Sequence, residues 1–344
     1  MFLCAKTASA AAAALGFGGY LLRLMGADLA LMPWLACGAV LLFTLLVLGG
    51  IRRTSRMNIA IVSLTLLALG SFVLFGLPRA LGDGTTNLMP LLPSGEPGGL
   101  QAFLYAIAIM FVAYTGYARI ATLGEEVVDP RRTIPRAIIV TLVVTAALYI
   151  LVAIVAIGSV GAGHFANAPD AQATPLELAA RSMDAPLLAR LVAVGAVTAM
   201  LGVLLNLILG LSRVMLAMGR QGDLPPLFAR VSEDGAAPPA AVIVVGILVA
   251  ILAAFGSVES AWAFSAFSVL IYYAITNLTA LRLPREQRMF PPWIAIGGLA
   301  ACLFLAFWVP VRIWLVGLSL IVIGLAWKAA MPRLWSTAKR GMRP

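Results

Sequence analysis

Long apolar stretches recur along this chain, separated by short segments that hold most of its charged residues, prolines and polar residues. A helix that crosses a membrane takes about 20 apolar residues. The stretches are apolar on all sides, whereas the strands of a membrane β-barrel would alternate. They therefore predict an all-α, polytopic transmembrane helical bundle of about ten helices. The expected spans are 2–24, 32–50, 58–77, 100–123, 134–160, 188–218, 239–256, 260–281, 292–309 and 311–329.

Composition supports this fold class. The chain is 62% hydrophobic and 11% charged, whereas a soluble domain is about 45–50% apolar and about 25% charged. We expect a single transmembrane domain over 1–330, embedded in the lipid bilayer, and a basic cytoplasmic tail over 331–344. Prolines stand at the expected span starts or, like Pro78, in loops, so a helix break inside a span has to come from glycine.

The basic residues determine the expected orientation. The net charge is +10, and most lysines and arginines fall in alternate connections and in the tail. This is the positive-inside pattern, so we expect a multi-pass protein of the cell (inner or plasma) membrane with both termini in the cytoplasm. No nucleic acid is needed to explain the charge. The cysteines and His164 have no ligand-like spacing, so we expect no metal and no cofactor.

Span 100–123 is interrupted by polar residues at its middle. Thr115 and Gly116 offer a point where the helix could unwind, and unwound backbone at the bilayer midplane occurs where it lines a cavity. Transporters build substrate and ion sites in this way. The alternative is that these small residues make a close helix–helix contact.

Charged residues follow this point. An arginine as deep as Arg119 should face a cavity or a partner. We interpret Glu125 and Glu126 as a cluster at the inner mouth, paired with nearby arginines, and an inner gate is the alternative.

These residues carry a resemblance. Residues 112–138, VAYTGYARIATLGEEVVDPRRTIPRAI, resemble the sixth helix and following loop of amino acid permeases in the amino acid–polyamine–organocation (APC) superfamily. Residues 210–225, GLSRVMLAMGRQGDLP, resemble the end of that family's eighth helix, and 32–77 and 272–283 also fit. The resemblance covers essentially the whole chain and implies a LeuT-like fold, with the expected spans corresponding to helices 3 to 12.

Helices 1 and 2 of the family are then expected to be missing from this sequence. Three explanations compete: a true start that lies upstream, a truncated gene, and a ten-helix transporter completed by dimerisation. The oligomeric state stays open.

The resemblance implies a site on the sixth helix. Ala113 to Tyr117 would be the unwound segment whose backbone binds an amino acid. Val112 stands where many members have an aromatic gate, which leaves occlusion to Phe111 or Tyr114. The implied substrate-binding residues are Tyr20, Ala113, Tyr114, Thr115, Gly116 and Tyr117.

Coupling candidates lie elsewhere. Thr65 occupies a position where proton-coupled relatives often have lysine, and with Thr198 it could coordinate sodium instead. Lys6, an ammonium group within a span, could serve as the proton-responsive cation, since a buried lysine releases its proton readily. The alternative is that Lys6 snorkels to the cytoplasmic interface. We favour proton coupling as a hypothesis.

The expected function is therefore secondary active transport of an amino acid. The candidates for gating are Phe111, Arg119, Glu125 and Glu126. The alternative is an N-terminally truncated, transport-inactive remnant or a membrane scaffold. An enzyme is not expected, because no acid, histidine or nucleophile–base pair lies within the spans.

Overall fold

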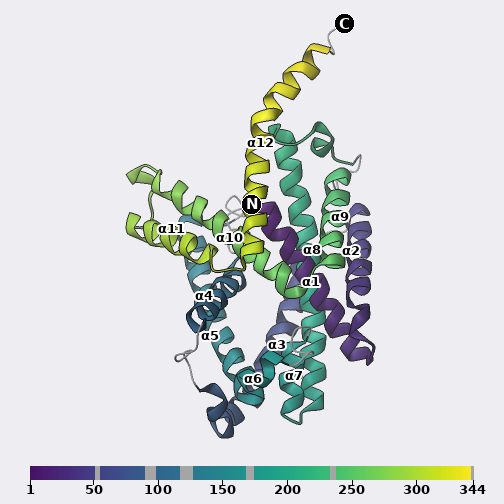
Figure 1. Ribbon diagram of the computed structural model, residues 1–344, viewed down its shortest axis with the longest axis vertical. Coiled ribbons are helices and arrows are strands. Elements are labelled where there is room, and N and C mark those ends of the chain that lie inside the picture. Colours follow the sequence, from purple (N-terminus) through teal and green to yellow (C-terminus); the bar gives the residue numbers. More distant parts are fainter. Residues whose placement is uncertain (51–54, 90–97, 117–126, 168–173, 233–237, 342–344) are drawn as a thin grey trace. The chain divides into compact units, whose positions relative to one another are not determined.

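The computed structural model describes residues 1–50, 55–89, 98–116, 127–167, 174–232 and 238–341 (Figure 1). In these residues the regular structure is helical and no strand occurs, which confirms the all-α prediction. The longer helices are α1 (Phe2–Met25), α2 (Met32–Leu48), α3 (Ser55–Leu81), α4 (Gly99–Met110), α5 (Pro130–Val160), α8 (Pro186–Gln221), α9 (Pro239–Phe255), α10 (Val258–Leu281), α11 (Pro292–Ala306) and α12 (Val311–Gly341).

Shorter elements connect them. The α-helices among these are α6 (Ala162–Asn167) and α7 (Pro175–Ser182), and the 3-10 turns are η1 (Leu29–Leu31), η2 (Asp83–Leu88), η3 (Phe111–Tyr114), η6 (Pro226–Ala229) and η7 (Arg285–Gln287).

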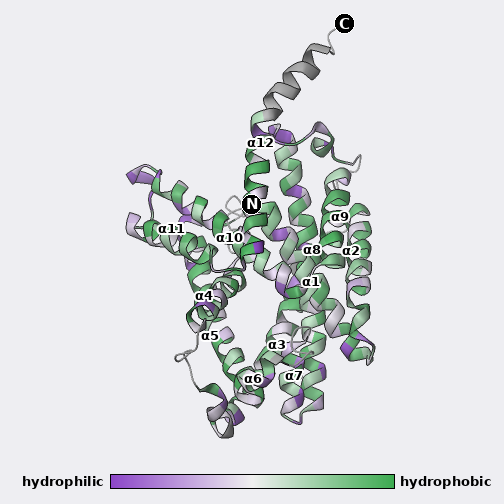
Figure 2. Cartoon of the chain, in the orientation of Figure 1, coloured by the Kyte–Doolittle hydropathy of each residue, from purple (hydrophilic) through white to green (hydrophobic). Residues whose placement is uncertain are grey.

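The apolar helices match the expected spans one for one. Among the described residues, seven helices are long and apolar enough to cross a membrane, and three shorter apolar helices cover Gly99–Tyr114, Pro239–Phe255 and Pro292–Ala306. Figure 2 shows apolar residues along most of each helix, with hydrophilic residues mainly toward helix ends and in the connections. The chain is therefore a polytopic helical membrane protein.

Prolines start several helices, but α3 and α5 also contain a proline inside the helix. Helix α5 begins at Pro130, ahead of the expected start at 134, so Pro135 lies within it. Proline stands at the first positions of α5, α7, α9 and α11, where its missing N–H would have had no helical partner. Pro78, expected in a loop, lies inside α3 instead. Proline removes the hydrogen bond to the carbonyl four residues earlier and crowds that turn. The helix ends three residues later, at Leu81, and the Pro78 carbonyl accepts a hydrogen bond from the Gly82 N–H at 3.0 Å. At the other end of the chain, α12 continues as helix to Gly341.

The chain forms two compact units. Unit 1 contains Met1–Ala12, Ala36–Arg52 and Val203–Pro344, and unit 2 contains Ala13–Leu35 and Arg53–Gly202.

The core of unit 2 is built by α3, α5, α7 and the start of α8. Its large buried side chains include Phe72, Val155 and Met183. Glycine allows α3 and α5 to approach closely, because a Cβ added at Gly76 would lie 2.3 Å from Val155 Cγ1. A Cβ added at Gly158 would likewise lie 2.7 Å from the Cβ of an α3 alanine. Small residues are the usual means of close helix contact in membranes.

In unit 1, α10 and α11 lie side by side (Figure 1). Phe267 of α10 is fully buried, and its ring makes an edge contact with Phe307 at 6.2 Å. Helices α2 and α9 pack through Gly246, where an added Cβ would lie 2.4 Å from Thr44 Oγ1.

Candidate functional site

The helix of the fourth apolar span ends shortly before Thr115 and Gly116, where the sequence offered a break. Helix α4 stops at Met110, and η3 tightens the chain over Phe111–Tyr114. Thr115 is then extended, with φ −88° and ψ 157°, and Gly116 has φ +123°. The Thr115 N–H and hydroxyl both donate to the Val112 carbonyl, at 3.1 and 2.8 Å. The main chain beyond Val112 has therefore left the α-helical ladder.

Gly116 is required by backbone conformation. Its φ of +123° lies in a region that side chains with a Cβ rarely adopt. No atom lies within 4 Å of the position that a Cβ would take. In the described part of the chain, therefore, the alternative interpretation of a tight small-residue helix contact has no support at Gly116.

Tyr149 of α5 holds this turn. Its hydroxyl donates to the carbonyl of Ala113 at 3.1 Å, and its ring makes an edge contact with the ring of Tyr114 at 5.3 Å. Sequence reasoning missed this residue. A signal was present, because a tyrosine in an apolar span needs a partner for its hydroxyl when it is buried, but nothing in the sequence indicated which one.

Four of the predicted residues, Tyr117, Arg119, Glu125 and Glu126, lie outside the described residues. Of the others near the break, Phe111 starts η3 and is half-buried.

Tyr20 lies in a second cluster of unit 2. Its side chain is buried, and its hydroxyl oxygen accepts a hydrogen bond from the Leu176 N–H at 3.4 Å. Leu176 belongs to the first turn of α7, where backbone N–H groups have no helical partner. Tyr20 therefore binds the start of α7 to α1.

Glu177, one residue further along α7, is the centre of this cluster and was not predicted. Its carboxylate is buried and accepts a hydrogen bond from the Thr174 hydroxyl at 3.3 Å. It forms ion pairs with Arg181 of α7 and, at 3.5 Å, with Arg23 of α1. A buried carboxylate requires such partners. The Thr-x-x-Glu spacing signals a helix start, but it does not reveal that the carboxylate binds two arginines.

Two threonines proposed for coupling lie on α3 and α8. The Thr65 hydroxyl donates to the Ile61 carbonyl at 2.8 Å, and the Thr198 hydroxyl donates within α8 at 3.0 Å. The two helices approach at Gly195, where an added Cβ would lie 2.6 Å from Ala68 Cβ. A hydroxyl oxygen that donates within its helix retains lone pairs for a cation. Lys6 is half-buried on the part of α1 that belongs to unit 1.

The arrangement thus joins Ala113 and Tyr114 to α5, and Tyr20 to α7, within unit 2. It does not place Lys6 in that unit. In the described residues, no group of three or more histidine, cysteine, aspartate or glutamate side chains is arranged to hold a metal ion.

Comparison with known proteins identifies the family. The sequence profile of amino acid permeases matches residues 2–337. The chain belongs to the amino acid permease family. The permease is 39% identical over 325 residues to an uncharacterised transporter of Mycobacterium tuberculosis, covering 94% of this chain and 70% of that relative.

More distant relatives are named for different substrates. The permease is 31% identical over 222 residues to a vacuolar protein of Arabidopsis thaliana named cationic amino acid transporter 4, covering 64% of this chain and 36% of the relative. It is 26% identical over 293 residues to the methylthioribose transporter of Bacillus subtilis, covering 83% of this chain and 61% of the relative. Together, the family and these relatives make the permease a multi-pass membrane transporter of small organic molecules and not an enzyme.

Proposed function

We propose that the permease moves amino acids across the membrane as a secondary active transporter, by alternating access around Phe111–Gly116. One observation carries this proposal: α4 stops at Met110, and the chain from Ala113 to Gly116 leaves the helical ladder within an apolar span. In transporters, a broken helix offers N–H groups to a carboxylate and carbonyls to a cation near the midplane. An amino acid carries both of these groups.

The side chains around the turn have distinct proposed roles. Tyr149 fixes the turn through the Ala113 carbonyl, so the backbone groups that follow are held in place before substrate arrives. The rings of Phe111 and Tyr114 are proposed to cover the substrate, and Thr115 and Tyr117 to line it. Tyr20 is proposed to reach the same substrate path from α1, and its O–H remains able to donate because its oxygen is the acceptor toward Leu176.

The proposed coupling ion is the proton. Lys6 is half-buried in an apolar helix, and an ammonium in such surroundings alternates between charged and neutral forms more readily than one in water. Thr65 and Thr198 provide the competing sodium hypothesis. Uptake into proteoliposomes driven separately by a proton gradient and by a sodium gradient distinguishes the two. Sodium-driven uptake that a pH gradient leaves unchanged would overturn proton coupling.

The distribution of basic residues supports a location in the cell (inner or plasma) membrane with both termini in the cytoplasm, and a single transmembrane domain over 1–330. Arg119, Glu125 and Glu126 are proposed to act at the inner gate. The names of the relatives contribute cationic amino acids and methylthioribose to the substrate panel for the assay, and neutral amino acids complete it.

The decisive test is Gly116→Leu in counterflow of a labelled amino acid. A side chain at φ +123° strains the backbone, and strain of this kind is typically about 1–3 kcal/mol. The turn should relax to another conformation, and transport should be lost. Gly297→Leu is the matched control, because Gly297 is an exposed helical glycine of α11 with nothing within 4 Å of its Cβ position. Wild-type counterflow in Gly116→Leu would remove the turn from the transport site. Both variants should insert into the membrane and remain monodisperse.

A further inference from the structure

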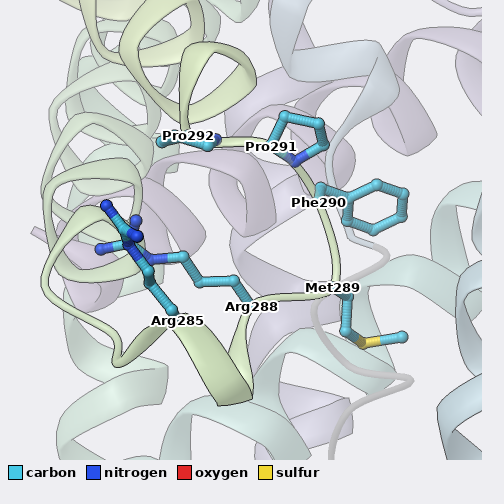
Figure 3. Close-up of a pocket in the computed structure, with 6 residues that line it drawn as sticks. All are labelled: Arg285, Arg288, Met289, Phe290, Pro291 and Pro292. Atoms are coloured by element: carbon cyan, nitrogen blue, oxygen red, sulfur yellow. The ribbon is translucent and has the colours of Figure 1, made fainter.

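The connection between α10 and α11 contains a pocket that the transport proposal does not use. It has a volume of about 570 Å³ and is lined by Arg285, Arg288, Met289, Phe290, Pro291 and Pro292 (Figure 3). All of these residues belong to unit 1. In Figure 3 the two arginine side chains extend to the same side of the loop, and the Phe290 ring lies on the other side.

The structure of the loop holds the Arg288 guanidinium in position. Its Nε donates to the carbonyl of Leu283 at 2.8 Å, and its Nη2 donates to the carbonyl of Leu281, the last residue of α10, at 2.9 Å. A guanidinium carries five N–H donors, so these bonds fix its orientation and leave Nη1 entirely available. Arg285 belongs to η7 and is exposed beside it.

Among the described residues, no ion pair involves Arg285 or Arg288, and the residues that line the pocket include no acid. Two guanidinium groups on one pocket repel each other and favour an anion. A phosphate group fits their donor geometry, because guanidinium binds phosphate through two parallel hydrogen bonds.

Apolar residues flank the arginine pair and are exposed. The exposed fractions are 57% for Met289, 54% for Phe290 and 69% for Trp293. Trp293 lies in the first turn of α11, and tryptophan is enriched where a helix meets the lipid headgroups. Contact with such an apolar surface does not stabilise a bound soluble anion, whereas it does stabilise the acyl chains of a bound lipid.

We propose that the pocket formed by Arg285, Arg288 and Phe290 binds the phosphate of an anionic phospholipid, with the acyl chains along the exposed start of α11. Under the proposed orientation this loop faces the cytoplasmic leaflet, where basic pockets beside helices bind acidic headgroups.

Native mass spectrometry of the detergent-solubilised chain tests the site, with phosphatidylglycerol as the probe and phosphatidylcholine as the neutral lipid. Arg285→Gln should weaken phosphatidylglycerol binding about fivefold (about 1 kcal/mol), as expected for one basic residue near a membrane surface. Arg282→Gln is the matched control, because it removes the same charge from the same loop outside the pocket. Arg288→Lys retains the positive charge but loses the paired N–H donors of the guanidinium. It should therefore also weaken the binding of phosphatidylglycerol.

Each outcome decides the proposal. Preference for phosphatidylglycerol over phosphatidylcholine that falls in Arg285→Gln and persists in Arg282→Gln supports it. An equal loss of this preference in both variants would show only a general effect of charge and would overturn the proposed binding site. If inorganic phosphate displaces phosphatidylglycerol at equal concentration, the proposal of a lipid ligand is overturned and the site binds a soluble anion. Equal melting temperatures in phosphatidylcholine establish that the variants are folded.

Discussion

Glu177→Gln removes the charge at the centre of the α1–α7 cluster while keeping the size of the side chain. The Glu177 side chain is 4% exposed, and the Arg23 side chain beside it is 30% exposed. At an effective dielectric constant of about 20, opposite charges at this separation of 3.5 Å attract by about 5 kcal/mol before the loss of hydration is subtracted. The Arg181 side chain is 54% exposed, and a pair of that kind contributes about 0–1 kcal/mol.

The net effect follows from these contributions. Breaking a fully buried ion pair costs about 3–5 kcal/mol. Arg23 retains some contact with solvent, and glutamine can still accept the hydrogen bond from Thr174. We therefore expect the docking of α7 on α1 to weaken by about 2 kcal/mol, which is about 30-fold in the equilibrium between docked and undocked α7.

Hydrogen exchange measured by mass spectrometry reports this equilibrium directly. Peptides that cover α7 (Pro175–Ser182) should exchange about 30-fold faster in Glu177→Gln, because local opening sets the exchange rate. Glu286→Gln removes the same charge from the exposed turn η7 and should leave α7 unchanged. Arg23→Gln should act more strongly than Arg181→Gln. The reasoning is refuted if α7 exchanges at the same rate in Glu177→Gln and Glu286→Gln.

Two further predictions concern the turn and the core of unit 2. Tyr149→Phe removes the hydrogen bond to the Ala113 carbonyl. We therefore expect a loss of about 1 kcal/mol in stability and a raised KM for uptake. An unchanged KM would show that the turn does not need this bond. Gly76→Ala places a Cβ 2.3 Å from Val155 Cγ1, and such overpacking destabilises by about 1–3 kcal/mol. Gly70→Ala, in the same helix with nothing within 4 Å, should stabilise by up to about 1 kcal/mol, and equal melting temperatures of the two variants would contradict the packing described here.

The parts of the fold that sequence predicts well depend on local chemistry. The apolar spans were located because about 20 apolar residues suffice to cross the bilayer core. A break at Thr115 and Gly116 was one of two interpretations of those residues, and a positive φ is a conformation for which glycine is suited. The end of α4 at Met110, ahead of that point, was not predicted. Pro78 was placed in a loop because a proline inside a helix removes a hydrogen bond to the preceding turn, a loss that α3 accommodates three residues before its end.

The parts that sequence missed depend on pairing between distant segments. Tyr20 and Leu176 are 156 residues apart in the chain, and no local pattern links them. Tyr149 was one tyrosine in an apolar span until the structure showed the Ala113 carbonyl beside it. Sequence analysis did not single out Glu177, and its burial became visible only with Arg23 and Arg181 beside it.

The distance along the chain between Tyr20 and α7 also imposes an order on biosynthesis. A ribosome adds about 5–20 residues per second, so the 156 residues between Tyr20 and Leu176 separate the two partners by roughly 8–30 s of translation. The end of α1 and the helices α2 to α6 are made in that interval, while neither Glu177 nor the start of α7 yet exists to meet α1. The contact between α1 and α7 is therefore a late event for the nascent chain, and it closes unit 2 only after most of that unit has been synthesised.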